Sequence, residues 1–329
     1  MPLPHIELNL IRYRRYHFHL KTPFLLQNGD EISKRTGILL YYPISNTTDT
    51  PYLIADVAPL PGFSHETCND VINALETLNI TSPSLQFGIE CIQLSLYAHR
   101  HHCSLSKAIA THFQEYGQCQ SVAKTDPRHT IRTNALLRIN SPKLQNEFNQ
   151  ITQSPQTIKL KLGYNDFKTE VKQLQQLCNQ SPNTIQFRLD PNQSWSPEQV
   201  SALFDEIPTE RIEYIEDPTE TISQIRQCKD HYSKIALDHL ATELTENDPL
   251  IHQINAIIYK PTLNGGIRPL INRFGSQLNR LKVIISHAFE SDIGMFYLHC
   301  MALAMAPHQY HGISPIKKSE IFIEEKTIT

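Results

Sequence analysis

Five charged residues in the second half of the chain have the types and the spacing that acid–base chemistry requires. Two are lysines and three are carboxylates, and they follow one another at intervals of 29, 26, 22 and 22 residues: Lys161, Asp190, Glu216, Asp238 and Lys260. Each stands at the end of a short apolar run that predicts a strand. If these strands are parallel neighbours, the five side chains meet at one edge of the sheet.

The first of these strands, 157–163, alternates strictly between apolar and basic residues. Its apolar side chains share one face, and Lys159 and Lys161 share the other. A solvated outer face is the simplest interpretation of such a pair, because charged side chains usually lie in water. A structural network of salt bridges is a second interpretation. The regular placement of charges at the ends of four further strands favours a functional site instead.

Three converging carboxylates would repel one another unless a cation held them together. Asp190, Glu216 and Asp238 offer only hard oxygen ligands, which suit Mg²⁺, with Mn²⁺ as a possible substitute. A lysine beside a divalent cation has its neutral form favoured and can act as a base. The cation would stabilise the charge that develops when a proton is removed next to a carboxylate. The pattern therefore predicts metal-assisted proton abstraction, with Lys161 and Lys260 as catalytic residues.

The elements that position these residues follow a repeated order of strand, turn and helix from Arg132 onward. This alternation is typical of a parallel sheet with right-handed crossovers. No Gly-X-Gly-X-X-Gly motif follows a strand, which argues against a dinucleotide site, and the number of strands favours a closed barrel. The active site of such a barrel lies at the C-terminal ends of its strands. We expect strands at residues 132–139, 157–163, 184–190, 211–217, 234–238, 256–262 and 282–287.

The N-terminal part has a different pattern, in which strands precede helices. Alternating residues favour strands, turn residues separate them, and apolar residues at helical spacing follow. We expect strands at 5–20, 36–43 and 53–58, a turn at Asn28–Asp30, and helices near 66–78 and 84–101.

The composition excludes several classes of protein. The 329 residues are 40% hydrophobic and carry a net charge of −3, which gives no reason to expect nucleic acid or an anionic membrane as a partner. No apolar run approaches the roughly 20 residues that span a bilayer, and the first residues lack a signal-peptide pattern. We expect a cytoplasmic protein. Seven scattered cysteines without a Cys-X-X-Cys pair indicate neither a disulfide framework nor a zinc ribbon.

Several motifs together carry a resemblance to a known family. In the second half they are Lys159-Leu-Lys161-Leu-Gly163, Arg188-Leu-Asp190-Pro-Asn192-Gln-Ser-Trp195, Ile215-Glu216-Asp217-Pro218, Asp238 and Lys260-Pro-Thr-Leu-Asn-Gly265. In the first half they are Arg35-Thr-Gly37, the segment from Ala58 to Thr67, and Phe87-Gly88-Ile89. Over nearly its whole length the chain resembles the enolase superfamily, and more narrowly the γ-proteobacterial branch of the o-succinylbenzoate synthases.

The resemblance implies a fold and an activity. The fold would be a modified (β/α)₇β TIM-like barrel, residues 126–312, under an N-terminal α+β capping domain, residues 1–125, which the C-terminal residues 313–329 would rejoin. The activity would be the Mg²⁺-dependent dehydration of 2-succinyl-6-hydroxy-2,4-cyclohexadiene-1-carboxylate to o-succinylbenzoate, in menaquinone biosynthesis. The partner would be this small-molecule carboxylate, and we expect a monomer.

The resemblance also assigns a role to each matching residue. Lys161 would remove the proton next to the carboxylate and return it to the departing hydroxyl, while Lys260 would stabilise the enediolate from the opposite face. The metal ligands would be Asp190, Glu216 and Asp238. Lys159 would tune Lys161, and Arg188 and Asn192 would orient the metal shell. Substrate contacts are expected at Ser286, His287 and Gly312.

The chain departs from the family pattern at three places. Asp56 stands where the family usually has a longer acid, and His239 follows the third carboxylate where the family usually has Glu. The run of hydroxyls near the substrate is replaced by His287 and Ala288. These changes leave the five charged residues intact and affect the expected substrate contacts.

Three other functions compete with dehydration. Racemisation of N-acylamino acids or epimerisation of dipeptides would use the same two lysines on opposite faces, and the sequence separates these activities poorly. A Schiff-base aldolase would use Lys161 or Lys260 as a nucleophile, but such chemistry needs no metal and leaves the three carboxylates unexplained. A non-catalytic binding protein on a decayed barrel would not need all five charged residues.

Overall fold

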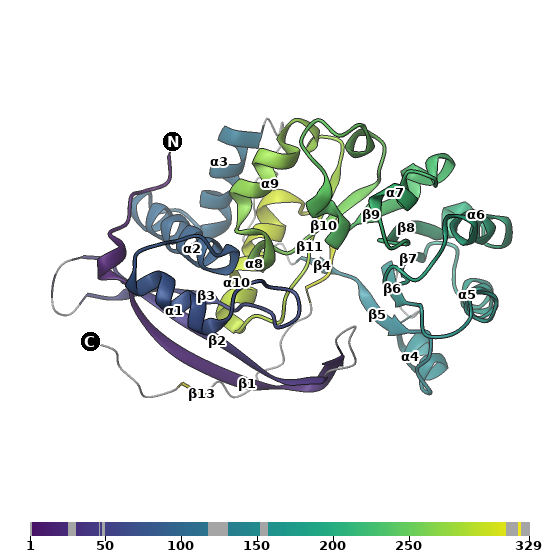
Figure 1. Cartoon of the computed structure of the whole chain (residues 1–329), viewed down its shortest axis with the longest axis horizontal. Helices are drawn as coiled ribbons and strands as arrows, with labels where there is room; N and C mark the ends of the chain where they lie inside the picture. The colour runs from purple at the N-terminus through teal and green to yellow at the C-terminus, as the bar shows by residue number, and fades with distance from the viewer. Residues whose placement is uncertain are drawn as a thin grey trace.

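An antiparallel sheet forms the first part of the chain. In this computed structural model β1 (Arg12–Leu25), β2 (Glu31–Pro43) and β3 (Tyr52–Val57) follow one another, and β13 (Phe322–Ile323) pairs with the outer edge of β1. Figure 1 shows the long β1–β2 hairpin along one side of the molecule, with β13 beside it. The structure describes residues 2–25, 31–45, 47, 50–117, 131–151, 157–313 and 322–323.

Three helices accompany this sheet: α1 (Cys68–Glu76), α2 (Pro83–Arg100) and α3 (Leu105–Gly117). Helix α1 begins with a capping box, in which the Thr67 hydroxyl accepts the Asp70 N–H and the Asp70 carboxylate accepts the Thr67 N–H. Helix α2 packs on β3, so that its apolar side chains and those of the sheet form one buried core. The first part is therefore an α+β unit.

The second part is a parallel sheet of seven strands in which every strand pairs with its neighbours in sequence order. The strands are β5 (Ala135–Arg138), β6 (Thr157–Lys161), β7 (Gln186–Asp190), β8 (Ile212–Glu216), β9 (Ile235–Leu237), β10 (Ala256–Tyr259) and β11 (Lys282–Ile285). Sequential pairing of parallel strands curls the sheet toward a barrel. Figure 1 shows the helices outside this curled sheet.

Helices on the outer face connect the strands. They are α4 (Leu144–Ile151), α5 (Phe167–Gln180), α6 (Pro197–Glu206), α7 (Ile222–Ile225), α8 (Pro261–Asn264), α9 (Ile267–Phe274) and α10 (Asp292–Met305), with short 3₁₀ turns between several of them. Local signals start two of these helices. Asp166 accepts the Thr169 N–H at the start of α5, and Ser196 accepts the Gln199 N–H at the start of α6.

A short last strand closes the ring. β12 (Tyr310–His311) pairs with β4 (Arg132–Thr133), the segment that leads into β5, and Ser286 at the end of β11 bridges to Gly312. The fully buried His311 fixes this closure, because its Nδ1 accepts the Ile285 N–H at 3.0 Å and its Nε2 lies 3.0 Å from the Ala306 carbonyl. Nδ1 accepts a hydrogen bond, so Nε2 carries the proton of the neutral ring.

Strand alternation separates the core from the site. On β6, Ile158 and Leu160 are fully buried under the outer helices, whereas Lys159 and Lys161 point to the inner face. Below the charged strand ends, the inner face is filled by one apolar cluster of Tyr214, Ala236, Ala256, Ile258 and Ile284. The barrel therefore has a packed floor and a polar mouth.

Most expected elements are confirmed, and the differences lie at their ends. The seven barrel strands occur where we expect them, each shorter by two to four residues. The strand expected at 5–20 is wrong at its start, because Leu8–Leu10 form a 3₁₀ turn and β1 begins at Arg12. The turn at Asn28–Asp30 and the domain boundary at 125/126 lie outside the described residues, so the domain limits stay a prediction. Among the described helices, none is both long and apolar enough to cross a bilayer.

Candidate active site

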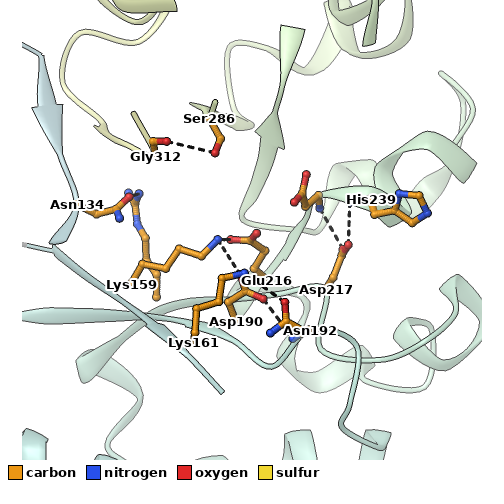
Figure 2. Close-up of polar contacts among 12 residues, drawn as sticks. Asn134, Lys159, Lys161, Asp190, Asn192, Glu216, Asp217, His239, Ser286 and Gly312 are labelled. Atoms are coloured by element: carbon orange, nitrogen blue, oxygen red, sulfur yellow. Dashed lines mark hydrogen bonds and ion pairs between the residues drawn. The ribbon is translucent and has the colours of Figure 1, made fainter. Parts of the chain in front are cut away.

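The C-terminal ends of β6, β7 and β8 bring one lysine between two carboxylates. Lys159 Nζ lies 2.8 Å from Asp190 Oδ2 and 2.6 Å from Glu216 Oε2. Figure 2 shows its side chain extended across the mouth toward both acids. Both carboxylates are almost fully buried, at 4% exposure each. The site therefore contains a desolvated cluster of opposite charges, in which electrostatic interactions are strong.

Lys161 lies on the outer side of this cluster. The ladder pairs it with Asp190, and its Nζ lies 2.6 Å from Asp190 Oδ2 and 3.2 Å from Asn192 Oδ1. The chain then turns sharply at Gly163, where φ is +83° and an added Cβ would lie 2.5 Å from the Pro191 carbonyl. A side chain at this position would be strained and would clash with backbone, so glycine holds the end of β6 against the β7 loop.

Lys260 approaches the site from the other side. It follows β10 and forms a close ion pair with Asp238, which follows β9. Three strands, β7 to β9, separate the strand of Lys161 from the strand of Lys260. The two catalytic candidates therefore approach the central carboxylates from different directions, as the sequence predicts.

The two central acids have pKa values that are shifted in opposite directions. Burial opposes the ionisation of Asp190, but the ammonium groups of Lys159 and Lys161 outweigh it and hold the pKa of Asp190 well below its usual range. For Glu216, burial and then the charge of Asp190 raise the pKa to about 7. A further cation beside Glu216 would therefore favour its charged form.

Lys159 and Lys260 are held in their charged form by their acidic partners. Burial alone would lower the pKa of Lys159, but Asp190 and Glu216 outweigh burial and raise it. Burial likewise opposes the charge on Lys260, and Asp238 followed by Glu216 raises its pKa. Each of these lysines thus balances negative charge on the carboxylates that it contacts.

Asp217 holds the backbone around Asp238, and the sequence analysis assigned it no role. Its carboxylate accepts the N–H group of His239 at 2.8 Å (Figure 2), and those of Asp238 at 3.0 Å and Leu240 at 3.2 Å. Burial, with a contribution from Asp238, raises the pKa of Asp217 to about 7. The sequence feature that could have identified this role is the position of Asp217 directly after Glu216 in the Glu-Asp-Pro motif.

The supporting residues predicted from the sequence lie in two places. Asn192 belongs to the mouth, because its N–H donates to Asp190 Oδ1 and its side chain contacts Lys161. Arg188 lies deeper, where its Nε donates to Glu213 at 2.8 Å and its Nη1 donates to the Tyr310 carbonyl at 2.6 Å. Arg188 therefore ties β7 to the closing strand and contacts none of the three candidate metal ligands.

The expected substrate contacts lie together across the closing strands. Ser286 Oγ donates to the Gly312 carbonyl at 3.3 Å (Figure 2), and the His287 N–H donates to the same carbonyl at 3.4 Å. His287 Nδ1 accepts the Phe289 N–H at 3.2 Å. Burial, and then the charges of Lys260 and Lys159, lower the pKa of His287 to about 4, so its ring is neutral. The assigned roles of these residues stay predictions.

The donor set fits a divalent cation, and each of its three carboxylates is paired with a lysine. In the described part of the chain, no three His, Cys, Asp or Glu side chains are grouped closely enough to hold a metal ion. Asp190 Oδ2 lies within ion-pair distance of two ammonium groups, yet it accepts no hydrogen bond in good geometry. Three buried or half-buried oxygen donors at adjacent strand ends are chemically suited to a hard cation.

The family follows from a comparison with known proteins. A family model described as "Enolase C-terminal domain-like" matches residues 144–325, which is more than half of the chain. The chain belongs to this enolase family. The match covers every barrel strand from β6 to β12, and therefore all five charged residues at the mouth.

Curated relatives extend the likeness into the first domain. The o-succinylbenzoate synthase of Klebsiella pneumoniae (strain 342) is 24% identical over 277 residues, covering 79% of this chain and 78% of the relative. That of Vibrio cholerae (serotype O1, strain M66-2) is 23% identical over 326 residues, covering 92% and 88%. The L-Ala-D/L-Glu epimerase of Bacillus subtilis (strain 168) is 33% identical over only 79 residues, covering 23% and 22%.

Solved structures confirm the enolase-superfamily fold, a modified TIM-like barrel with an N-terminal cap. The Mg-containing o-succinylbenzoate synthase of Thermosynechococcus elongatus BP-1 matches with a TM-score of 0.64 and 23% identity, over 92% of each chain. A dipeptide epimerase of Enterococcus faecalis V583, complexed with Mg and L-Leu-L-Tyr, matches with a TM-score of 0.71 and 16% identity, over 92% of this chain and 89% of that one. At these identities the likeness establishes the fold and does not separate the activities.

Proposed function

We propose that this enolase-family enzyme is an o-succinylbenzoate synthase, which dehydrates 2-succinyl-6-hydroxy-2,4-cyclohexadiene-1-carboxylate in menaquinone biosynthesis. The observation that carries the proposal is the extent of the likeness. Relatives with this name match up to 92% of the chain, whereas the curated epimerase matches 23% of it. Since the cap and loops of such enzymes carry specificity and the barrel carries the chemistry, a match across both domains favours the synthase.

The three carboxylates would hold a Mg²⁺ ion, for which Mn²⁺ can substitute. Asp190, Glu216 and Asp238 are the ligands in this proposal, and Mg-containing solved structures of the same fold support it. A bound Mg²⁺ would stabilise the negative charge that develops on the substrate carboxylate. Asp217 would keep the third ligand in place through its three backbone contacts.

Lys161 serves as base and then as acid in this proposal. Its neutral amine takes the proton from the ring carbon that bears the carboxylate, and the resulting ammonium gives a proton to the hydroxyl on the neighbouring carbon. That carbon–oxygen bond breaks, water leaves, and the ring gains its third double bond. Lys260, from the opposite side, stabilises the negative charge with its ammonium group. Because the product ring is aromatic, the reaction is strongly downhill.

An epimerase or racemase of N-acylamino acids or dipeptides is the alternative function. It is favoured by the placement of Lys161 at the end of β6 and of Lys260 directly after β10, with three strands between them, because such a reaction needs two lysines on opposite faces of one carbon. Such a reaction requires matched protonation states, with one lysine neutral and the other charged. Dehydration requires only Lys161 to exchange protons. Lys260 can therefore stay charged in its close ion pair with Asp238 throughout the reaction.

The test is to follow the conversion of the cyclohexadiene substrate to the aromatic product by ultraviolet absorbance. We expect rapid conversion by the Mg²⁺-loaded protein and none by Lys161→Ala. The matched control is Lys168→Ala, which removes an exposed lysine of α5 on the outer face of the barrel. No conversion by the wild-type protein, with racemisation of N-succinylamino acids instead, would overturn the proposal in favour of the alternative.

A further inference from the structure

Arg138 is a cation at the barrel mouth that has no role in the chemistry described above. The parallel ladder places it opposite Lys161, and it places Leu136 opposite Lys159. Paired residues of neighbouring strands point to the same face. Leu137, between them, is buried against the outer helices. Arg138 and Leu136 therefore face the inside of the barrel, on the side of the proposed base.

The guanidinium of Arg138 is exposed and has no acidic partner among the residues that the structure describes. The other cations of the inner face differ from it, because each is paired with a carboxylate: Lys159 and Lys161 with Asp190, Lys260 with Asp238, and Arg188 with Glu213. The chain thus presents one positive charge at the mouth that its described residues do not neutralise. A negatively charged part of the substrate is a suitable partner for it.

Apolar surface surrounds this cation. Leu136 is 52% exposed and Tyr164 is 46% exposed, although both are large and largely apolar. Tyr164 follows Lys161, the ladder partner of Arg138, by three residues. Burial raises the pKa of Tyr164, and the charge of Arg138 opposes this shift. The surface therefore suits an anion attached to an apolar chain.

The loop that carries Tyr164 is firmly held. The buried Glu170 accepts the N–H groups of Gly163 and Tyr164 at 2.9 Å and that of Asn165 at 3.1 Å. Three backbone hydrogen bonds to one charged group fix the loop at the side of the mouth. Tyr164 can therefore serve as a fixed wall beside Arg138.

We propose that Arg138 is a specificity-determining residue that binds the distal carboxylate of a substrate with two carboxylates, while the reacting carboxylate lies at the lysine and acid centre. The inference rests on the proposed function, because the succinyl chain of that substrate carries such a second carboxylate. The planar guanidinium can bind it with two parallel hydrogen bonds, and Leu136 and Tyr164 cover the methylene groups of the chain.

The experiment compares the binding of two ligands by calorimetry in the presence of Mg²⁺. They are o-succinylbenzoate and 2-butanoylbenzoate, which has a methyl group in place of the distal carboxylate. We expect the wild-type protein to prefer the first by about ten- to a hundredfold, the range for a charge-assisted hydrogen-bond pair. Arg138→Met should bind both ligands with similar affinity, and Arg138→Lys should retain part of the preference.

Lys168→Met is the matched control and should keep the full preference, because its lysine lies on the outer face. A full preference in Arg138→Met, or none in the wild type, would overturn the inference. If the wild-type protein bound neither ligand, the synthase proposal would fail. The same comparison between N-succinylphenylglycine and N-butanoylphenylglycine would then decide the role of Arg138 separately. Binding of none of the four ligands would overturn both proposals.

Discussion

Lys161 on β6 and Asp190 on β7 are paired in the parallel ladder, and Lys161 Nζ lies 2.6 Å from Asp190 Oδ2. The proposed base and a proposed metal ligand are thus neighbours by strand register. Gly163 and Asn192 fix the backbone on either side of the pair. This relationship places the proposed acid–base group directly beside the proposed metal ligand.

The first prediction concerns the metal. Chelation should abolish turnover, and added Mg²⁺ or Mn²⁺ should restore it. Asp190→Asn should weaken Mn²⁺ binding, measured by electron paramagnetic resonance, because an amide oxygen carries no full charge. Asp205→Asn, at an exposed position on α6, is the control and should bind Mn²⁺ as the wild type does. Unchanged Mn²⁺ affinity in Asp190→Asn would contradict the assignment.

The second prediction separates the two lysines. Lys161→Ala should lower kcat by at least about a hundredfold, because both the base and the acid are lost. Lys260→Ala should also lower kcat, and Lys260→Arg should not restore it, since a planar guanidinium cannot replace a compact ammonium beside Asp238. Steady-state kinetics with circular dichroism as a folding check would measure this. Wild-type kcat in either alanine variant would disprove the assignment.

The third prediction concerns the contact between the cap and the barrel. Glu90 of α2 accepts the N–H groups of Ile267 at 2.5 Å and Arg268 at 3.2 Å, and so caps α9, whose own N-cap residue, Gly266, has no side chain. Glu90→Ala should lower the free energy of unfolding by about 1–3 kcal/mol, because one buried and one half-buried N–H group lose their acceptor. Calorimetric melting would measure it.

Glu243→Ala is the control for this change, since Glu243 is exposed. Equal melting temperatures for the two variants would show that Glu90 does not stabilise the contact between the domains.

The sequence predicted the barrel better than it predicted the contacts within it. The barrel strands are readable because each is an apolar run that ends in a charge. β12 was missed because two residues give no periodic signal. The cap of α9 was missed for another reason, since its acceptor, Glu90, lies 177 positions earlier in the chain. Contacts of that sequence separation depend on how the domains dock.

The candidate site shows the same limit. The spacing of charges at strand ends pointed to two lysine–carboxylate pairs, Lys161–Asp190 and Lys260–Asp238, and to Glu216 on the strand between them, and the roles of these residues stay predictions. It did not show that Lys159 contacts both Asp190 and Glu216. The alternation of residues along a strand gives the face of a side chain and does not give how far that side chain extends across neighbouring strands. Arg138 was not identified as a site residue from the sequence, because the apolar Ile139 follows it and the strand pattern does not end in a charge. Arg188 was expected at the metal shell and contacts Glu213 instead.

The fourth prediction concerns pH and the closing strand. Burial lowers the pKa of His311 to about 4, from a usual value of 6.5. Between about pH 4 and pH 6.5, His311 therefore binds a proton in the unfolded chain and does not bind one in the folded chain. The contribution of His311 to stability is complete above pH 6.5 and is lost as the pH falls toward 4, at a cost of about 3 kcal/mol.

Chemical denaturation at several pH values would measure this effect. His311→Gln should show a flatter fall in the free energy of unfolding between pH 6.5 and 4, whereas His252→Gln, at an exposed histidine, should follow the wild type. Identical slopes for all three proteins would mean that His311 is not buried in its neutral form.

The most direct test of the central claim is the ratio of kcat/KM values for dehydration and racemisation, measured on one preparation. The substrates are 2-succinyl-6-hydroxy-2,4-cyclohexadiene-1-carboxylate, followed by ultraviolet absorbance, and N-succinylamino acids, followed by deuterium exchange in heavy water. We expect dehydration to be the faster reaction, with racemisation weak or absent. Racemisation faster by about tenfold, a difference of about 1.4 kcal/mol in transition-state stabilisation, would contradict the synthase function and leave only membership of the enolase family.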